Sequence, residues 1–391
     1  MDFYRRSLEL KDETVAHRRF LHKNAETGTD LPVSCNYIWE KLQEYGFAPQ
    51  KCGCGITAAT GMGKPVILLR ADMDALPMTE QSGEEFSPTH GKAAHTCGHD
   101  MHAAMLLCAA KMLKENEKQL KGTVKFMFQP GEETLTGCAD MIENGILQKP
   151  TPDAAFALHT AAGKIPLGHF MYNAGGVMMS SSDYFTMTVT GKGGHGAYPH
   201  LAVDPINTAV QIYTAFNSII AKESDPEKTC LLTVGRLSAG SAGNIIPDSA
   251  VMEGALRTDS PEMRAKLRRR MEQTSLGIAE AFDCGAHLQW TAGAPALVCE
   301  KDFTADMVNF AMQLDIPALA PVPDMKANAS EDFANIAQKI PSAMFYISAG
   351  FDDHRGDFTA HNPKVRFNED CLVQGAAIYA HCAAQWLADN G

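Results

Sequence analysis

Eight consecutive residues, His95 to His102, carry the side chains of this sequence that are best suited to chemistry. The run reads His-Thr-Cys-Gly-His-Asp-Met-His and holds one thiol, three imidazoles and one carboxylate. All of these groups are donors to a borderline-soft metal ion. We therefore interpret the run as part of a metal site or, as an alternative, as the surroundings of a cysteine nucleophile.

Further potential ligands follow at three later places in the sequence. They are Glu132 and Glu133 in Gln-Pro-Gly-Glu-Glu, His159 after Ala-Leu, and His361 in Thr-Ala-His-Asn-Pro. Each has an ordinary explanation when seen alone, as an acidic turn, a core histidine or a loop histidine. Their weight as evidence depends on whether the fold brings them to one place.

The elements that must position these donors are apolar strands with helices between them. We expect strands at residues 65–69, 123–128 and 153–158, each followed by acidic residues or by His159. Helical patterns at residues 102–120 and 137–145 separate the strands. Alternating strands and helices predict a doubly wound α/β sheet, in which ligands bind beyond the carboxyl ends of the strands. Since the donors follow these ends, the sequence favours a metal site over ordinary loop chemistry.

Length and composition restrict the class of protein. A chain of 391 residues is expected to form two domains. With 34 basic against 46 acidic residues, we expect neither nucleic acid nor an anionic membrane as a partner. No apolar stretch approaches the length of a membrane span. Eleven cysteines without framework spacing, and a start without an apolar secretion signal, predict reduced thiols and a cytoplasmic location.

The pattern changes between residues 183 and 289. We expect strands at residues 184–190, 229–237, 250–257 and 286–290, with helices at residues 202–222 and 261–282. The order β-α-β-β-α-β is ferredoxin-like. A helix at residues 303–314 and a buried strand at residues 343–347 follow. We therefore predict a catalytic domain made of residues 1–181 and 293–391, interrupted by a small α+β domain at residues 182–292.

Three residues of the inserted domain fit a role in binding a carboxylate as a set. His195 lies in a glycine-rich loop at a strand end, Asn244 lies in Gly-Asn-Ile-Ile-Pro, and Arg257 ends a strand. Arginine is the natural bidentate partner of a carboxylate. In the first domain, Glu132 and Glu133 point in different directions if the strand persists, so that one can bind a metal while the other acts as general base.

Four residues near the donors remain open between roles. His102 lies one helical turn beyond His99 and is a metal ligand, a residue that supports a ligand, or a packing residue. Asp72 and Asp74 are either ligands or acids that orient the ligands. Asp100 is expected to orient an imidazole.

Five sequence blocks, taken together, resemble the signature of a known family. They are residues 95–102, Arg-Ala-Asp-Met-Asp-Ala-Leu-Pro at 70–77, residues 129–133, Gly-Lys-Gly-Gly-His-Gly-Ala-Tyr-Pro-His at 191–200, and Ser-Glu-Asp-Phe at 330–333. The chain resembles the amidohydrolase branch of the aminoacylase/carboxypeptidase metallopeptidases. That branch includes hippurate hydrolases, N-acyl-amino-acid amidohydrolases and auxin-conjugate hydrolases. The resemblance spans nearly the whole chain.

The resemblance implies a zinc-exopeptidase fold with a ferredoxin-like lid that serves in dimerisation. It implies two divalent metal ions per subunit, zinc or manganese, with nickel and cobalt as further options. The implied metal ligands are Cys97, His99, Glu133, His159 and His361, and the implied general base is Glu132. His195 is implied to reach an active site, often that of the partner subunit, in a homodimer or a dimer of dimers. The peptidase branches carry His-x-Asp where this chain has Asp72-x-Asp74.

The expected reaction is hydrolysis of the amide bond of an N-acyl-L-amino acid to a carboxylic acid and a free amino acid. Glu132 is expected to move the proton, His195 to stabilise the oxyanion, and Asn244 with Arg257 to hold the α-carboxylate. The nearest alternative is a dipeptidase or carboxypeptidase on the same scaffold. Alternatives of other classes are a metal-dependent binding protein and an amidase with Cys97 as nucleophile.

Overall fold

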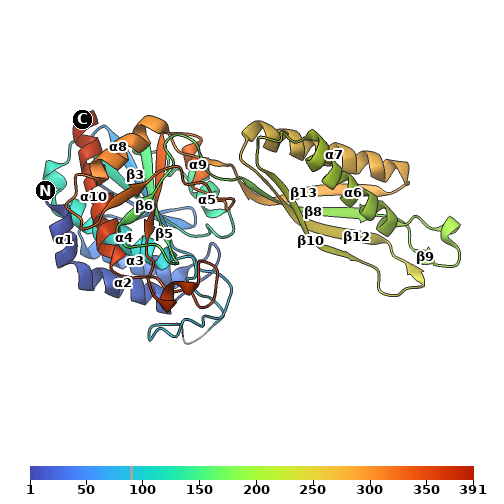
Figure 1. The fold of residues 1–391 in the computed structure, drawn as a ribbon, viewed down its shortest axis with the longest axis horizontal. Coiled ribbons are helices and arrows are strands. Elements are labelled where there is room, and N and C mark those ends of the chain that lie inside the picture. Colours follow the sequence, from blue (N-terminus) through green and yellow to red (C-terminus); the bar gives the residue numbers. More distant parts are fainter. Residues whose placement is uncertain (89–90) are drawn as a thin grey trace. The chain divides into compact units, whose positions relative to one another are not determined.

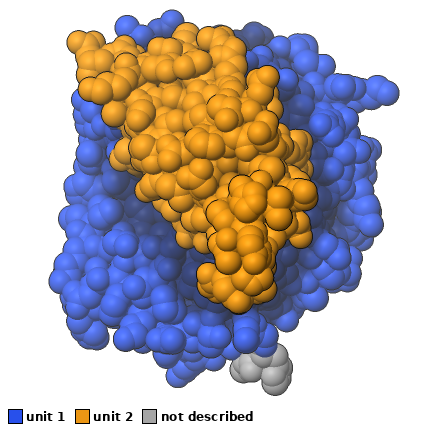
Figure 2. Space-filling model, turned by 90° about the vertical axis from the view of Figure 1, so that its right-hand side faces the viewer, with its two compact units in different colours: residues 1–178, 298–326, 332–391 blue, residues 179–297, 327–331 orange. Residues whose placement is uncertain are grey.

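The computed structural model describes residues 1–88 and 91–391, which divide into two compact units (Figure 1, Figure 2). Unit 1 comprises Met1–Met178, Val298–Lys326 and Asp332–Gly391, and unit 2 comprises Met179–Leu297 and Ala327–Glu331. None of the helices in the described residues combines the length and apolar character that a membrane span needs.

Unit 1 is built around an eight-stranded sheet with the order β1-β2-β4-β3-β5-β16-β6-β15. The strands are β1 (Gln50–Cys52), β2 (Gly55–Gly61), β3 (Val66–Asp72), β4 (Thr123–Gln129), β5 (Ala154–Ala161), β6 (His169–Met171), β15 (Ala320–Val322) and β16 (Ser342–Ser348). The four strands that apolar runs predicted, β4, β3, β5 and β16, lie side by side and parallel at the centre. Their burial along nearly their whole length explains why they are continuously apolar.

The sheet is mixed: its four central strands are parallel, whereas the strands next to them on either side run antiparallel to them. β2 runs antiparallel to β4, and β6 runs antiparallel to β16. Only Gly53 and Cys54 separate β1 from β2, and only residues 162–168 separate β5 from β6. Connections this short cannot hold the crossover that parallel strands require, so each of these strand pairs reverses direction.

Helices cover both faces of this sheet. They are α1 (Phe3–Glu9), α2 (Lys11–Lys23), α3 (Pro32–Glu44), α4 (His99–Glu115), α5 (Gly137–Glu143), α8 (Lys301–Ala311), α9 (Ala334–Ala337) and α10 (Cys371–Asn390), with 3-10 turns η1 (Glu117–Gln119) and η3 (His354–Asp357). α4 and α10 pack against β3 and β5 and against each other, and α2 packs on α4. α5 and α9 lie on the other side of the sheet (Figure 1). α4 is buried along most of its length, which fits a helix that is apolar on nearly all sides.

Unit 2 holds a four-stranded antiparallel sheet with the order β10-β12-β8-β13 and two helices. Its main elements are β8 (Ser182–Thr190), α6 (Pro205–Glu223), β10 (Cys230–Ala239), β12 (Ser249–Thr258), α7 (Pro261–Ala281) and β13 (Gly285–Ala294). Its short elements are β9 (Gly194–His195), η2 (Pro199–Leu201) and β11 (Ile245–Ile246), whereas β7 (Val177–Met179) and β14 (Leu297–Val298) span the points at which the chain passes from one unit to the other.

The core of unit 2 lies between the helices and one face of its sheet. α6 and α7 pack against each other and against the strands, and the alternating burial of β8 places Phe185, Met187 and Val189 in this core. The predicted boundary residues, 182 and 292, lie inside unit 2. A role of this unit as a lid or in dimerisation stays a prediction.

Candidate metal and catalytic site

The carboxyl ends of the parallel strands β3, β4 and β5 meet at one edge of the central sheet. Asp72, the last residue of β3, pairs in register with Gln129, the last residue of β4. His159 lies near the carboxyl end of β5, two residues before the last residue of the strand. Because parallel strands end on the same side, the segment with Glu132 and Glu133 enters the same region as His159.

Gly98 sets the start of α4 and thereby the placement of Cys97 and His99. Its φ of 89° lies in the left-handed region, and a Cβ at this position would come within 2.3 Å of Thr160 Oγ1. Glycine avoids both the strain and the clash. The helix begins at His99, three residues before the start predicted from apolar periodicity, because this turn and not the apolar pattern initiates it.

Cys97, His99 and His159 form the first group of converging donors. Their ligand atoms all lie within 4.8 Å of one another, and Cys97 Sγ is 3.6 Å from His159 Nε2. His159 Nδ1 donates to the carbonyl oxygen of Thr160 at 2.8 Å. That hydrogen bond places the proton on Nδ1, so the lone pair of Nε2 faces Cys97, as it does in histidines that ligate metals.

Glu133 joins this group to His361 and Glu132. Glu133 Oε1 lies 3.5 Å from His361 Nε2 and 3.9 Å from His99 Nε2, while Glu132 Oε2 lies 4.0 Å from His99 Nε2. Two further sets of mutually close donors result, Cys97-Glu133-His361 and His99-Glu132-Glu133. The structure therefore brings together all five predicted ligands and the predicted base.

Unsatisfied polar atoms show that this cluster fits a metal. Within the described residues, both ring nitrogens of His99 and Oε1 of Glu133 are buried without a hydrogen-bond partner. Buried polar atoms in folded proteins are nearly always paired, and binding of an ion is one of the few explanations for a set of unpaired ones. Thiolate, imidazole and carboxylate together suit zinc and similar divalent metals.

The protein shifts the pKa values of three of these donor residues away from their usual values. Burial by itself lowers the pKa of His99, but the carboxylate of Asp72 outweighs it and holds that pKa well above its usual range. Burial and the neighbouring His102 hold the pKa of His159 well below its usual range. Burial raises the pKa of the Cys97 thiol to about 12, although His99 opposes this. A thiol that the protein alone keeps protonated is poorly activated as a nucleophile, which argues against a cysteine amidase.

His102 and Asp72 are engaged in hydrogen bonds with the protein. Thr160 N donates to His102 Nε2 at 2.8 Å, so Nδ1 carries the proton and donates to Asp72 Oδ1 at 2.5 Å. Asp72 Oδ2 accepts from Arg70 Nη1 at 2.8 Å. Burial by itself raises the pKa of Asp72, but Arg70, His99 and His102 hold it well below its usual range. Neither nitrogen of His102 is left for a metal, and Asp72 is held as a carboxylate 3.8 Å from His99 Nε2.

Asp74 fixes the segment that carries the two glutamates. Its Oδ1 accepts from Glu132 N at 3.0 Å and its Oδ2 accepts from Glu133 N at 3.1 Å. The same carboxylate lies 3.5 Å from His99 Nδ1. Asp74 therefore links the Glu132–Glu133 backbone to the start of α4.

Asp100 orients an imidazole that the sequence analysis missed. Its Oδ2 accepts from His22 Nδ1 at 2.9 Å and from Arg18 Nε at 2.8 Å, both on α2. The sequence analysis expected Asp100 to orient an imidazole without naming it, and the structure gives it a histidine 78 residues earlier in the chain. The sequence signal that could have indicated this contact is the spacing of Arg18 and His22, which lie four residues apart and therefore on one face of a helix. His95, the first residue of the histidine-rich run, is buried near His22 and joins none of the donor groups.

In unit 2, His195 and Asn244 lie next to each other. His195 is the second residue of β9 and pairs with Ile245 of β11. Asn244 O accepts from Gly196 N at 2.8 Å. The His195 ring is exposed, and its Nδ1 accepts from Ala197 N at 3.1 Å.

Arg257 lies apart from these two residues within unit 2. It is near the end of β12, and its Nη1 donates to Asn328 O and Ser330 Oγ, both at 3.2 Å. Asn244 precedes the start of β12 at Ser249. Eight residues of strand separate Ser249 from Arg257, a span of about 27 Å. Within unit 2, Asn244 therefore precedes one end of β12 and Arg257 lies near the other end; a shared role in binding a carboxylate stays a prediction.

Comparison with known proteins extends over nearly the whole chain. Residues 68–385 match the family described as Peptidase family M20/M25/M40. The chain is 33% identical over 389 residues to the N-acetyl-L-cysteine deacetylase of Bacillus subtilis, with 97% of this chain and 89% of the relative covered. It is 34% identical over 394 residues to IAA-amino acid hydrolase ILR1-like 2 of Arabidopsis thaliana, with 99% and 88% covered.

A solved structure of a member of this family also resembles the chain over nearly its whole length. A Bacillus subtilis protein described as a dinuclear metal binding peptidase from M20 family superposes with a TM-score of 0.80 at 28% sequence identity. The superposition covers 97% of this chain and 99% of that one. The similarity is therefore not confined to the unit that holds the converging donors.

Proposed function

This chain belongs to Peptidase family M20/M25/M40 and is a metal-dependent amidohydrolase; from that premise we propose that it hydrolyses the amide bond of N-acyl amino acids. The products would be a carboxylic acid and a free amino acid. The observation that carries the proposal is the convergence of six donor side chains around buried, unsatisfied atoms of His99 and Glu133. The names of the deacetylase and of the IAA-amino acid hydrolase support an acylated amino acid as the substrate class.

We assign the metal ligands to the residues whose donor atoms are free to face the cluster. They are Cys97, His99, Glu133, His159 and His361. The set would hold two divalent ions, zinc or manganese, with nickel and cobalt as further options. When bound, such ions polarise the amide carbonyl and lower the pKa of water.

Glu132 is the proposed general base. It is 6% exposed, and its backbone is held by Asp74. Its carboxylate lies at the edge of the donor cluster, 4.0 Å from His99. In this position it can take a proton from the attacking water and later deliver that proton to the leaving nitrogen.

His195, Asn244 and Arg257 are the proposed substrate-binding residues of unit 2. His195 would donate to the oxyanion, and Arg257 would pair with the α-carboxylate. Since Asn244 adjoins His195 and lies far from Arg257 along β12, we place Asn244 with His195 at the acyl carbonyl. If a dimer forms, His195 and Asn244 would act in the active site of the partner subunit, while Arg257 would act in the active site of its own chain. This arrangement is compatible with the separation of the two positions along β12.

The second candidate function is a dipeptidase or carboxypeptidase, which the description of the superposed structure as a peptidase favours. The two functions differ in whether the acyl side of the amide carries a free ammonium. The test compares N-acetyl, N-benzoyl and long-chain N-acyl amino acids with dipeptides that share the same C-terminal residue. We expect a higher kcat/KM on the N-acyl compounds, loss of activity with a chelator and recovery with zinc or manganese. A higher kcat/KM on the dipeptides would favour the second function.

A further inference from the structure

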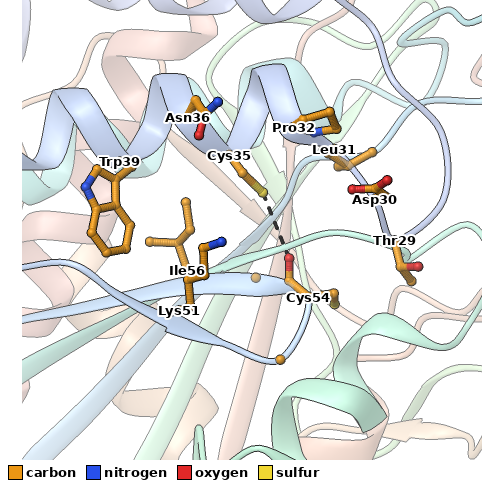
Figure 3. A pocket seen from close by; sticks show the side chains of 12 residues that line it. Thr29, Asp30, Leu31, Pro32, Cys35, Asn36, Trp39, Lys51, Cys54 and Ile56 are labelled. Atoms are coloured by element: carbon orange, nitrogen blue, oxygen red, sulfur yellow. Dashed lines mark hydrogen bonds between the residues drawn. The ribbon is translucent and has the colours of Figure 1, made fainter.

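A cavity of about 450 Å³ lies between the N-terminal half of α3 and the β1–β2 hairpin of unit 1 (Figure 3). Its volume falls within the range of small-molecule pockets. Leu31, Trp39 and Ile56 supply an apolar lining. None of its lining residues belongs to the donor cluster described above, so the cavity is a separate feature of the molecule.

Two opposite charges border this cavity. Lys51 lies beside Ile56 and towards Trp39, whereas Asp30 lies towards the other side (Figure 3). Both are close enough to the Cys35 thiol, in the cavity wall, to affect its pKa in opposite directions. In the described part of the chain neither charge has an ion-pair partner. A ligand with one positive and one negative group is therefore complementary to the cavity.

The N-terminus of α3 does not compete with Lys51 for an anion. Glu26 already occupies it, because the Glu26 carboxylate accepts from Val33 N at 3.1 Å and from Ser34 N at 2.8 Å. A carboxylate in the cavity would meet the carboxylate of Glu26 at that end. Lys51 is thus the group to which a carboxylate of the ligand would bind.

We propose that this cavity binds a small zwitterionic amino compound, a free amino acid or a dipeptide, with an apolar side chain. The carboxylate pairs with Lys51, the ammonium pairs with Asp30, and the apolar side chain packs against Trp39 and Ile56. A compound that lacks either charge leaves one of these two side chains without its partner.

The walls of the cavity are attached to the segment that holds the candidate base. Cys54 N donates to Asp140 Oδ2 at 2.6 Å, and Asp140 lies on α5, directly after that segment. Thr29 lies against Gly131, since a Cβ on Gly131 would come within 2.6 Å of Thr29 Cγ2. The occupant would therefore lie close to the catalytic segment without entering the donor cluster.

Cysteine labelling can locate the ligand. Cys35 and Cys54 line the cavity and are partly exposed, so an occupant should slow their alkylation. Burial raises the pKa of Cys35 to about 11 and that of Cys54 to about 12, so labelling is slow; it is followed over long times near neutral pH, where the amino group of the ligand stays protonated. Phenylalanine or alanyl-phenylalanine, at twice its dissociation constant, should slow the labelling about threefold, as expected for one-site occupancy. Cys230 in unit 2 is partly exposed and should react at an unchanged rate.

Blocked analogues and variants complete the experiment. 3-Phenylpropionate and phenylalaninamide each lack one charge and should protect Cys35 and Cys54 less than phenylalanine does. Lys51→Met should weaken the protection by phenylalanine about three- to fivefold, the scale of an ion pair at a partly exposed site. Lys118→Met, which removes an exposed charge on η1, is the matched control and should leave it unchanged.

The outcomes separate this proposal from the proposed catalytic function. Stronger protection by the dipeptide or by the amino acid identifies which of the two is the occupant. Equal protection by 3-phenylpropionate, no protection at either thiol, or an unaffected Lys51→Met variant would overturn the cavity proposal. Protection of Cys97 by N-acyl amino acids reports the donor cluster independently, so either proposal can fail while the other stands.

Discussion

Glu132 and Glu133 have different surroundings although they are neighbours in sequence. Glu133 lies between His99 and His361, and burial, which raises its pKa, is outweighed by those two imidazoles, which lower it. Glu132 lies at the edge of the cluster, with its backbone N–H bound to Asp74. This arrangement fits one ligand and one base, and each role can be removed separately.

Glu132→Gln should remove the base while leaving the ligands in place. We expect kcat to fall by about 10²- to 10⁴-fold, the usual contribution of general acid–base catalysis, with metal content near that of the wild type. Steady-state kinetics and elemental analysis on the same preparation would measure both quantities. Wild-type turnover in this variant would remove Glu132 from the mechanism.

Cys97→Ala should lower the affinity for metal, because it deletes a donor of two of the three-residue groups. We expect substoichiometric metal after dialysis, with activity partly recovered at high added metal. Cys382→Ala, which removes a buried thiol outside the cluster, is the matched control for loss of a sulfur. An inactive Cys97→Ala protein with full metal content would favour a nucleophilic cysteine instead.

At the scale of elements, α2 holds the start of α4 and the end of α3 in place. Arg18 and His22 bind Asp100 in the first turn of α4. His17, which directly precedes Arg18 on the same helix, lies between two tyrosines. Tyr45 Oη donates to Glu13, so His17 Nε2 donates to Tyr45 Oη and Nδ1 accepts from Tyr37 Oη, each at 2.7 Å. The donor segment thus depends on a helix that contributes no ligand.

The His17 contacts should make the helical layer sensitive to acid. Burial lowers the pKa of His17 from 6.5 to about 4, with Glu13 opposing and Lys41 and Lys111 assisting. Below pH 6.5, His17 binds a proton in the unfolded chain, whereas in the native state it binds that proton only below about pH 4. The free energy of unfolding should therefore fall as the pH drops through this window, by at most about 3 kcal/mol, and should not change above it on account of this group.

Urea unfolding at pH 7.5 and pH 4.5 would measure the effect. His17→Gln keeps a donor and an acceptor but does not titrate, so its free energy of unfolding should fall less between the two pH values. His169→Gln, at a histidine whose ring binds only a nearby carbonyl, is the control and should retain the wild-type difference. An unchanged pH dependence in His17→Gln would assign the acid sensitivity to other groups.

At the scale of the whole molecule, the distribution of functional residues over two units is the main feature. The donor cluster and Glu132 belong entirely to unit 1, whereas His195, Asn244 and Arg257 belong to unit 2. The length of β12 separates Asn244 and His195 from Arg257. If all three residues act on one substrate, as proposed above, this separation predicts that a second subunit contributes to each site.

Subunit mixing tests this arrangement. His195→Ala and Glu132→Gln should each be inactive alone. If His195 serves the partner's site, a mixed dimer contains one site in which both residues are intact, and mixing should restore part of the activity. Subunit exchange would be verified by native mass spectrometry. No recovery after verified exchange would mean that His195 acts within its own chain or has no catalytic role.

The sequence by itself determined the local features of this protein. The apolar runs located β3, β4, β5 and β16, because strands buried on both faces are continuously apolar. The donor residues follow these runs directly, and parallel strands end on one side of a sheet, so their convergence could be predicted. The five sequence blocks identified the amidohydrolase branch of the family, which the comparisons confirm.

Only the tertiary structure decided which polar groups meet each other. The role of His102, on α4, could be either that of a ligand or that of a support until Thr160 and Asp72, from two different strands, were seen to occupy both of its nitrogens. The direction of β2 and β6, and the distance between Asn244 and Arg257, likewise depend on how strands pair across the sheet. The periodicity of a segment and its residue types depend on which of its side chains are buried, so they can be interpreted from the segment alone. A hydrogen bond between two distant segments leaves no such pattern in the sequence of either segment.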